Sequence, residues 1–357
     1  MIRKILVGLD KSDLSLKALQ QAILFAKVYG AQLKLAYALV GNELDALRGI
    51  SYFDSYSYPG MNITMLESYE IAWDQFVVNS NAWLGQKISE TQKAYANTSG
   101  TLLHGNPGAK LCELAETWNA DFIIVGSRSF SGIGELLMGS VSNHVMHHAP
   151  CSVLLVHSDK QSKMSTPTID LDTDVQQLPQ RILVPVDKSS MAERAMLAAV
   201  DLAKLCKAEV KLLHVIDGDE HDMPQKVILS DSRYMLQHNR FLLEKYQHDW
   251  NKFIDGRWRW LQTQVQRIED EGVDAICDVM QGRTGPCICG VAEDWGADLI
   301  MIGSRGLTGL KELLVGSVSY YVSHRASCSV LIKRLKHSKQ ETSGVMHKSQ
   351  EVTLVNP

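Results

Sequence analysis

Two glycine-rich stretches have the residue types that bind phosphate. The chain reads GSRGLTGLKELLVGSVS at 303–319 and GSRSFSGIGELLMGSVS at 126–142. Small residues let backbone N–H groups approach phosphate oxygens, and the start of a following helix carries partial positive charge. We therefore predict a triphosphate site at 303–319, with added hydroxyl donors from Ser317 and Ser319. Its residues are Gly303, Gly306, Gly316, Ser317, Val318 and Ser319.

Arg305 also lies inside this loop, where it either reaches phosphate or is an exposed solubilising side chain. The alternative for the whole loop is that its glycines only permit a tight turn from a strand into a helix and bind no ligand.

The stretch at 126–142 is a changed copy of the same loop. Where the later copy has Gly306, it has Ser129. If that position needs a positive φ, serine costs roughly 1 to 2 kcal/mol and directs a Cβ towards the ligand. We therefore expect an intact site in the second half of the chain and a degenerate one in the first. The matching residues of the first half are Asp10, Gly126, Arg128, Gly139, Ser140, Val141 and Ser142.

The two loops belong to an internal repeat. A shift of 177 residues aligns Asp10 with Asp187, Trp118 with Trp295 and Cys151 with Cys328 without a gap at any of these anchors. A period of this length is too long for a solenoid unit, so it predicts two complete domains. We place them at 1–157 and 181–335, joined by a polar linker at 158–180 and followed by a flexible tail at 336–357.

Each half alternates short apolar runs with helical patterns, which predicts an α/β fold with a doubly wound, parallel, five-stranded sheet. Pro185, Val186 and Asp187 end the first strand of the second half, at the edge of the sheet where the glycine loop also begins. We expect the two last strands to meet across a pseudo-twofold axis, because this pairing covers exposed sheet edges in an intramolecular pseudo-dimer. The expected strands are 2–9, 33–40, 101–105, 121–127 and 151–156 in the first half, and 181–186, 210–217, 276–282, 298–304 and 328–333 in the second.

The pattern G-x2-G-x9-G-[ST], together with Val186, Asp187 and Ser189 upstream, resembles the ATP-binding class of universal stress proteins. The resemblance covers both halves nearly end to end. It implies a Rossmann-like fold of the adenine nucleotide alpha-hydrolase type, an ATP ligand with or without Mg²⁺, and a cytoplasmic stress-response or regulatory role. It also implies that Asp187 meets the adenosine moiety and that Val215 contacts adenine. In the first half, Ala38 stands in place of Val215 and Gly8 in place of Pro185.

Composition excludes several other functions. A formal net charge of −4 and a pI near 6.3 argue against nucleic acid, and no apolar run reaches the length of a membrane span, so we expect a cytosolic protein. The seven cysteines and the histidines at 144, 147 and 148 lack the spacing and partners of a metal site. With no P-loop lysine and no paired catalytic groups, we expect a binder with at most slow ATP hydrolysis.

The helical patterns at about 64–97 and 234–271 differ most between the halves and are rich in aromatic residues. Aromatic residues at helical spacing are usually core or interface. The alternative function is therefore a nucleotide-independent module that binds proteins or lipophilic ligands through these helices. A homodimer is a further expectation.

Overall fold

The computed structural model describes residues 2–40, 63–127, 138–157, 178–218, 220, 222–224, 236–304 and 315–335. The strands are β1 (Lys4–Leu9), β2 (Gln32–Leu39), β3 (Thr98–His104), β4 (Phe122–Gly126), β5 (Ser152–Val156), β6 (Arg181–Pro185), β7 (Glu209–Ile216), β8 (Ala275–Gln281), β9 (Leu299–Gly303) and β10 (Ser329–Lys333). The helices are α1 (Asp13–Tyr29), α3 (Ile63–Ala94), α4 (Pro107–Thr117), α5 (Ser140–His148), α6 (Ser190–Cys206), α7 (Leu236–Glu269), α8 (Thr284–Trp295) and α9 (Ser317–Arg325).

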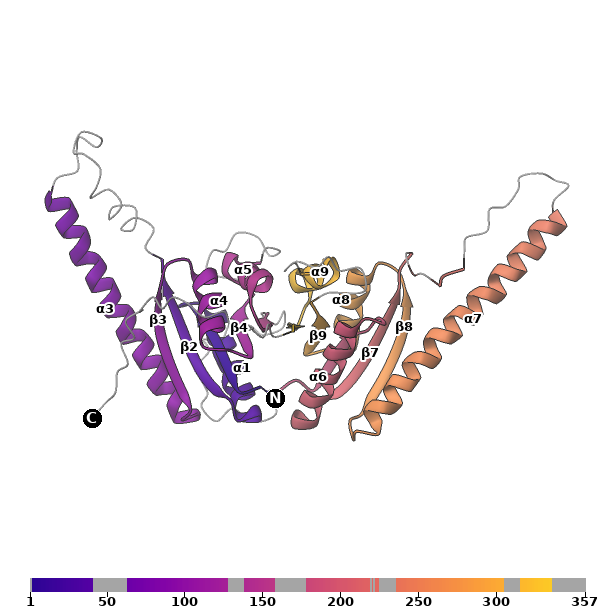
Figure 1. Cartoon of the computed structure of the whole chain (residues 1–357), viewed down its shortest axis with the longest axis horizontal. Helices are drawn as coiled ribbons and strands as arrows, with labels where there is room; N and C mark the ends of the chain where they lie inside the picture. The colour runs from indigo at the N-terminus through magenta and orange to yellow at the C-terminus, as the bar shows by residue number, and fades with distance from the viewer. Residues whose placement is uncertain are drawn as a thin grey trace, which may run out of the picture.

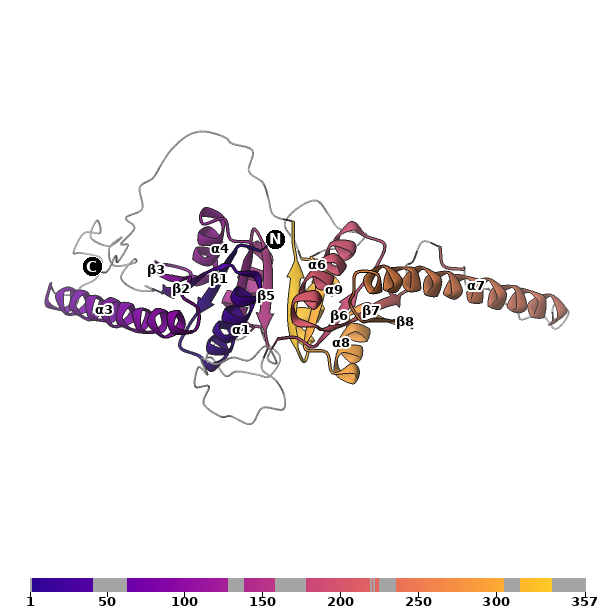
Figure 2. The same ribbon diagram turned by 90° about the horizontal axis from the view of Figure 1, so that it is seen from below.

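The strands form one continuous sheet in the order β3-β2-β1-β4-β5-β10-β9-β6-β7-β8. Within each half every neighbouring pair is parallel, as the alternating pattern predicts. At the centre, β5 pairs with β10 in antiparallel orientation (Figure 2), and Leu154 lies opposite Leu331. These two leucines are 177 residues apart, so the pseudo-twofold axis passes between equivalent residues. The predicted meeting of the two last strands is therefore confirmed.

Polar contacts around this junction follow the same pseudo-symmetry. The imidazole of His157, just after β5, lies 3.0 Å from the carbonyl of Ser323 in α9. Its equivalent, Arg334, donates to the carbonyls of Met146 and Ala149 at the end of α5. A cation at a helix C-terminus is favourable because the last carbonyls have no partner inside the helix. The last residues of each half therefore hold the final helix of the other half.

Both faces of the sheet are buried. On one face, α1, α3, α6 and α7 cover residues such as Ile5 and Ile182, and on the other face α4, α5, α8 and α9 cover residues such as Leu6 and Leu183. Strands buried on two faces read as continuous apolar runs, which is why KILVGL and RILVP lack strict alternation.

The chain turns directly from β1 and β6 into helices. Ser12 and Ser189 are the N-caps of α1 and α6, and their hydroxyls accept from the backbone N–H three residues later. These caps fall where the serines after the first strand of each half predict them. The sequence was less accurate for β3, which begins at Thr98 and not at residue 101.

The helices α3 and α7 are 32 and 34 residues long and extend beyond the sheet as two diverging arms (Figure 1). Their C-terminal parts pack on the core through Trp83 and Leu84 in α3 and through Trp260 and Leu261 in α7. Their N-terminal parts carry exposed apolar side chains, which include Ile71 and Phe241. The packed part of each helix thus forms a wall beside the carboxyl end of β2 or β7.

Candidate functional site

The predicted site residues gather at the point where the strand order reverses. In the first half the chain runs outward from β1 to β2 and β3, then returns to place β4 on the other side of β1. Asp10 follows β1 and Gly126 ends β4, so both lie at the carboxyl edge of these neighbouring strands. Asp187 and Gly303 have the same places beside β6 and β9. Ligands of doubly wound sheets bind in this crevice.

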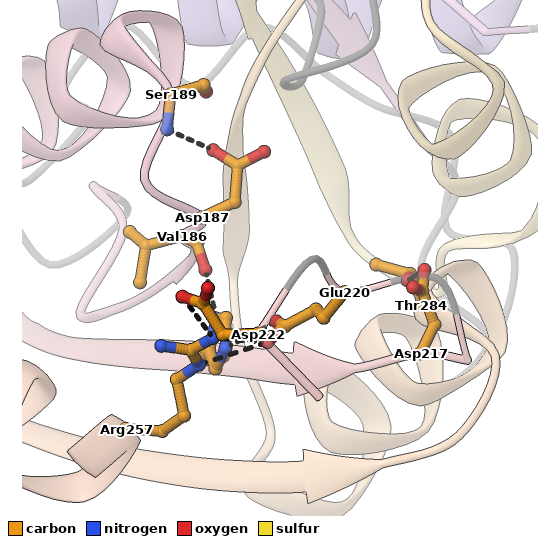
Figure 3. Close-up of polar contacts among 9 residues, drawn as sticks. Val186, Asp187, Ser189, Asp217, Glu220, Asp222, Arg257 and Thr284 are labelled. Atoms are coloured by element: carbon orange, nitrogen blue, oxygen red, sulfur yellow. Dashed lines mark hydrogen bonds and ion pairs between the residues drawn. The ribbon is translucent and has the colours of Figure 1, made fainter. Parts of the chain in front are cut away.

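The two aspartates are oriented by the turns that follow them. Asp10 accepts through Oδ1 from the backbone N–H of Ser12 at 2.8 Å and also from the Ser12 hydroxyl. Asp187 accepts through Oδ1 from the N–H of Ser189 at 2.9 Å (Figure 3). Because one oxygen fixes the carboxylate, the second oxygen is held in a defined direction, as recognition of a ligand hydroxyl requires.

The helices after the glycine loops begin without side-chain caps. Gly139 and Gly316 are the N-caps of α5 and α9, have φ values of −64° and −63°, and provide no side chain for capping. The first backbone N–H groups of a helix have no partner inside the helix, so here they are available to an anion. Ser140 and Ser317, the first residues of these helices, are exposed.

Ser142 and Ser319 do not have the role that the sequence predicts for Ser319. Both are buried, and each donates its hydroxyl to a carbonyl at the end of the preceding strand, Ser142 to Ser127 at 2.8 Å and Ser319 to Gly303 at 2.7 Å. In this arrangement the hydroxyl positions the start of the helix, so the prediction of a phosphate donor from Ser319 is wrong for this conformation. Val141 and Val318, between the two serines, are half-buried.

Three predicted site residues, Arg128, Arg305 and Gly306, lie outside the described residues, together with Ser129. The contrast between the two glycine loops therefore stays a prediction from the sequence.

A pocket of about 330 Å³ lies at the predicted edge in the first half. Five of the predicted residues line it, namely Asp10, Gly126, Gly139, Val141 and Ser142. The rest of its wall comes mainly from the ends of β1 and β2 and from the helices α3 and α4. These additional residues are Gly8, Leu9, Ser15, Ala36, Tyr37, Ala38, Val40, Phe76, Pro107, Leu111 and Val125.

The pocket wall includes residues that the sequence did not assign to a site. Phe76 belongs to the aromatic stretch of α3 that the sequence assigned to core or interface, and it reaches the pocket while 40% exposed. Tyr37 packs against Trp83 with ring centroids 5.0 Å apart, and its burial raises the pKa of the phenol. The phenol is therefore neutral at physiological pH, so this end of the pocket is apolar and aromatic.

The equivalent wall of the second half is more polar. His214, predicted as a satisfied strand residue, lies with Nδ1 2.9 Å from the carbonyl of Val186 and with Nε2 2.9 Å from Oε1 of Glu220. The other oxygen of Glu220 is 2.9 Å from Nη2 of Arg257, which in turn lies 3.8 Å from Asp222 (Figure 3). Pro185 and Val215, predicted contacts, lie beside this group at the ends of β6 and β7.

The remaining candidates for chemistry have structural surroundings. In α5, the rings of His144 and His148 are 4.4 Å apart, and burial lowers the pKa of His144. Over the described part of the chain, no group of three or more His, Cys, Asp or Glu residues is placed to hold a metal ion. No helix in the same residues has the length and hydrophobicity of a membrane span.

Comparison with known proteins gives matches over both halves. The model of the family described as "Universal stress protein family" matches residues 1–157 and 179–334. Universal stress protein Sll1388 of Synechocystis is 33% identical over 158 residues, which cover 43% of this chain and 96% of the relative. Universal stress protein Mb2028c of Mycobacterium bovis is 25% identical over 261 residues, 73% of this chain and 76% of the relative. A universal stress protein structure from Archaeoglobus fulgidus has a TM-score of 0.58 at 19% identity and covers 93% of this chain and 98% of that one.

Proposed function

Because this chain belongs to the universal stress protein family, we propose that it binds an adenine nucleotide, ATP with or without Mg²⁺, at the carboxyl edge of its sheet. The observation that carries the proposal is the first-half pocket, in which Asp10 and Gly126 meet the uncapped start of α5. A volume of about 330 Å³ is within the usual range for small-molecule sites.

The residues fit the parts of a nucleotide. The N–H groups at the start of α5 suit the phosphates, the fixed carboxylate of Asp10 suits a sugar hydroxyl, and the apolar wall at Tyr37 and Phe76 suits the base. The second half has the same order of parts, with Asp187 at the strand end and Gly316 before α9. Its phosphate loop has the complete glycine pattern, whereas the first half has Ser129 in its loop.

The protein acts in this proposal as a binder, with at most slow hydrolysis of ATP. Nucleotide occupancy would alter its conformation or its choice of partner in a cytoplasmic stress response.

Calorimetry with MgATP tests the binding. We expect wild-type protein to bind, Gly139→Val and Gly316→Val each to remove one site, and the double variant to lose both. Valine tolerates the observed φ near −64°, so these variants should fold, while the added side chain obstructs the helix start. Gly290→Ala, on the exposed side of α8, is the control. Equal binding by the double variant and the wild type would refute the proposal.

A second function is suggested by the long helices. Ile71 in α3 is 70% exposed and Phe241 in α7 is 63% exposed, both on the parts that extend beyond the sheet. Exposed apolar side chains on a projecting helix are typical of an interface. If these helices make a homodimer, Ile71→Asp and Phe241→Asp will lower the mass measured by light scattering, and the nucleotide-site variants will leave it unchanged. A monomeric wild-type protein would contradict the dimer.

A further inference from the structure

The two halves present different walls to the base side of the proposed site. The shift of 177 residues aligns Val40 with Asp217 and Pro107 with Thr284. Val40 and Pro107 line the first-half pocket, on opposite sides of it, at the end of β2 and at the start of α4. Asp217 and Thr284 stand at the corresponding places after β7 and at the start of α8.

In the second half these two positions are bonded to each other. The hydroxyl of Thr284 donates to Oδ2 of Asp217 at 2.7 Å (Figure 3). Valine and proline side chains cannot form such a bond, so Val40 and Pro107 leave the first-half pocket open between them. The hydrogen bond therefore crosses the space through which a base would enter the second site.

An ion pair fixes the same side of the second site. Arg257 in α7 is 9% exposed, and its guanidinium carbon lies 4.4 Å from the ring centroid of Phe253. Phe253 is the equivalent of Phe76, which lines the first pocket. Arg257 also donates from Nε to Oε2 of Glu220 at 3.0 Å. It thus covers the aromatic surface that the first half leaves to a ligand.

Glu220 extends this contact to the strand. Its second oxygen faces His214, which is itself bonded to the carbonyl of Val186 at the end of β6. The segment after β7 is consequently tied to α7 on one side and to β7 on the other. In the first half, Ser80 replaces Arg257 and Tyr37 replaces His214, so the same clamp cannot form there.

Charge acts in the same direction. Asp217, Glu220 and Asp222 bring three carboxylates to this side of the second site, and Arg257 is the guanidinium placed among them. A nucleotide that carries several negative charges is repelled by unbalanced carboxylates at short range. The first pocket has Asp10 as the carboxylate in its described wall.

We propose that Arg257 and Asp217 determine which of the two sites is filled first. The Glu220–Arg257 ion pair and the Asp217–Thr284 bond close the base side of the second site, so nucleotide occupies the first-half pocket before it enters the second. This inference rests on the proposed nucleotide function. It gives an order of filling opposite to the one expected from the glycine loops, because the wall of the base and not the phosphate loop limits the second site.

The test exchanges wall residues between the halves and measures MgATP affinity at one site at a time. In a Gly139→Val background, which leaves the second site, Arg257→Ser and Asp217→Val introduce the first-half residues. We expect each to tighten MgATP binding at least tenfold. In a Gly316→Val background, which leaves the first site, Val40→Asp should weaken binding at least tenfold. Arg240→Ser is the matched control, because Arg240 pairs with Glu244 on the same helix but is exposed, and it should change nothing.

The outcomes separate the two proposals. If MgATP binds the wild type but Arg257→Ser and Asp217→Val leave the affinity of the second site unchanged or weaken it, the order of filling is wrong and the nucleotide function stands. If the wild type binds no MgATP, both proposals fail. Thermal melting of each variant checks folding. Where Arg257→Ser does not fold, Asp217→Val still decides, because Asp217 lies at the sheet edge and its removal leaves only the Thr284 hydroxyl to solvent.

Discussion

Replacement of Arg334 by alanine tests the junction between the two halves. Its guanidinium donates to the carbonyl of Ala149 at 2.8 Å and to the carbonyl of Met146, both at the end of α5. A hydrogen bond from a charged group contributes about 1.5 to 3 kcal/mol, and a cation at a helix C-terminus about 0.3 to 1 kcal/mol. Since Arg334 is only half-buried and water can reach the carbonyls after its removal, we expect a loss of about 2 to 3 kcal/mol in total for Arg334→Ala.

Urea denaturation followed by tryptophan fluorescence measures this loss as a shift of the midpoint at constant slope. Arg334→Lys keeps the charge but loses the two-pronged geometry, so it should lose about half as much. Arg325→Ala, at an exposed position at the end of α9, is the control and should stay within about 0.5 kcal/mol of the wild type. A similar result for Arg334→Ala would show that the contacts across the junction do not stabilise the fold.

Three further predictions concern packing and titration. Gly285→Ala places a Cβ 2.6 Å from the Tyr321 ring and should lower the free energy of unfolding by about 1 to 3 kcal/mol, whereas Gly290→Ala in the same helix meets nothing within 4 Å and should raise it by about 0.5 to 1 kcal/mol; urea denaturation compares the two. Burial raises the pKa of Tyr29, so its contribution to stability is present below the ordinary tyrosine pKa of about 10 and is lost as the pH rises above it. Tyr29→Phe should reduce this alkaline loss in melts from pH 8 to 11, and an unchanged profile would contradict it. Burial raises the pKa of Cys328 to about 12, so this thiol should not react with a disulfide reagent at pH 8 until the protein is unfolded, as mass spectrometry of the labelled peptide can check.

The duplication made much of the fold predictable. Because equivalent residues recur 177 positions apart, each half confirms the reading of the other, and the apolar run CSVLIK repeats CSVLLV. The antiparallel meeting of these strands followed from the need to cover two equal sheet edges, and the structure pairs Leu154 with Leu331 as that symmetry requires. Local signals were also sufficient for the helix caps at Ser12 and Ser189.

The site was less predictable because its wall is assembled from distant segments. Phe76 reaches the first pocket from a long helix whose aromatic spacing fits core and ligand contact equally well. The hydrogen bond between Asp217 and Thr284 joins residues 67 positions apart, and neither residue has a motif around it. The role of Ser319 was misassigned because a serine at a helix start can donate outward or back to the preceding strand, and only the position of the Gly303 carbonyl decides between them.

The different origins of the two ends of the site explain why the halves can diverge independently. The phosphates would be held by backbone N–H groups at the start of α5 or α9, which depend on Gly139 or Gly316 and hardly on neighbouring side chains. The base would be held by side chains after β2 or β7 and on the long helix, where a single change such as serine to arginine at position 257 alters shape and charge together. A substitution in the loop therefore changes affinity without changing access, and a substitution in the wall changes access without changing the loop. The glycine pattern alone consequently cannot rank two sites within one chain, whereas the wall residues at 217 and 257 give a ranking that single exchanges can reverse.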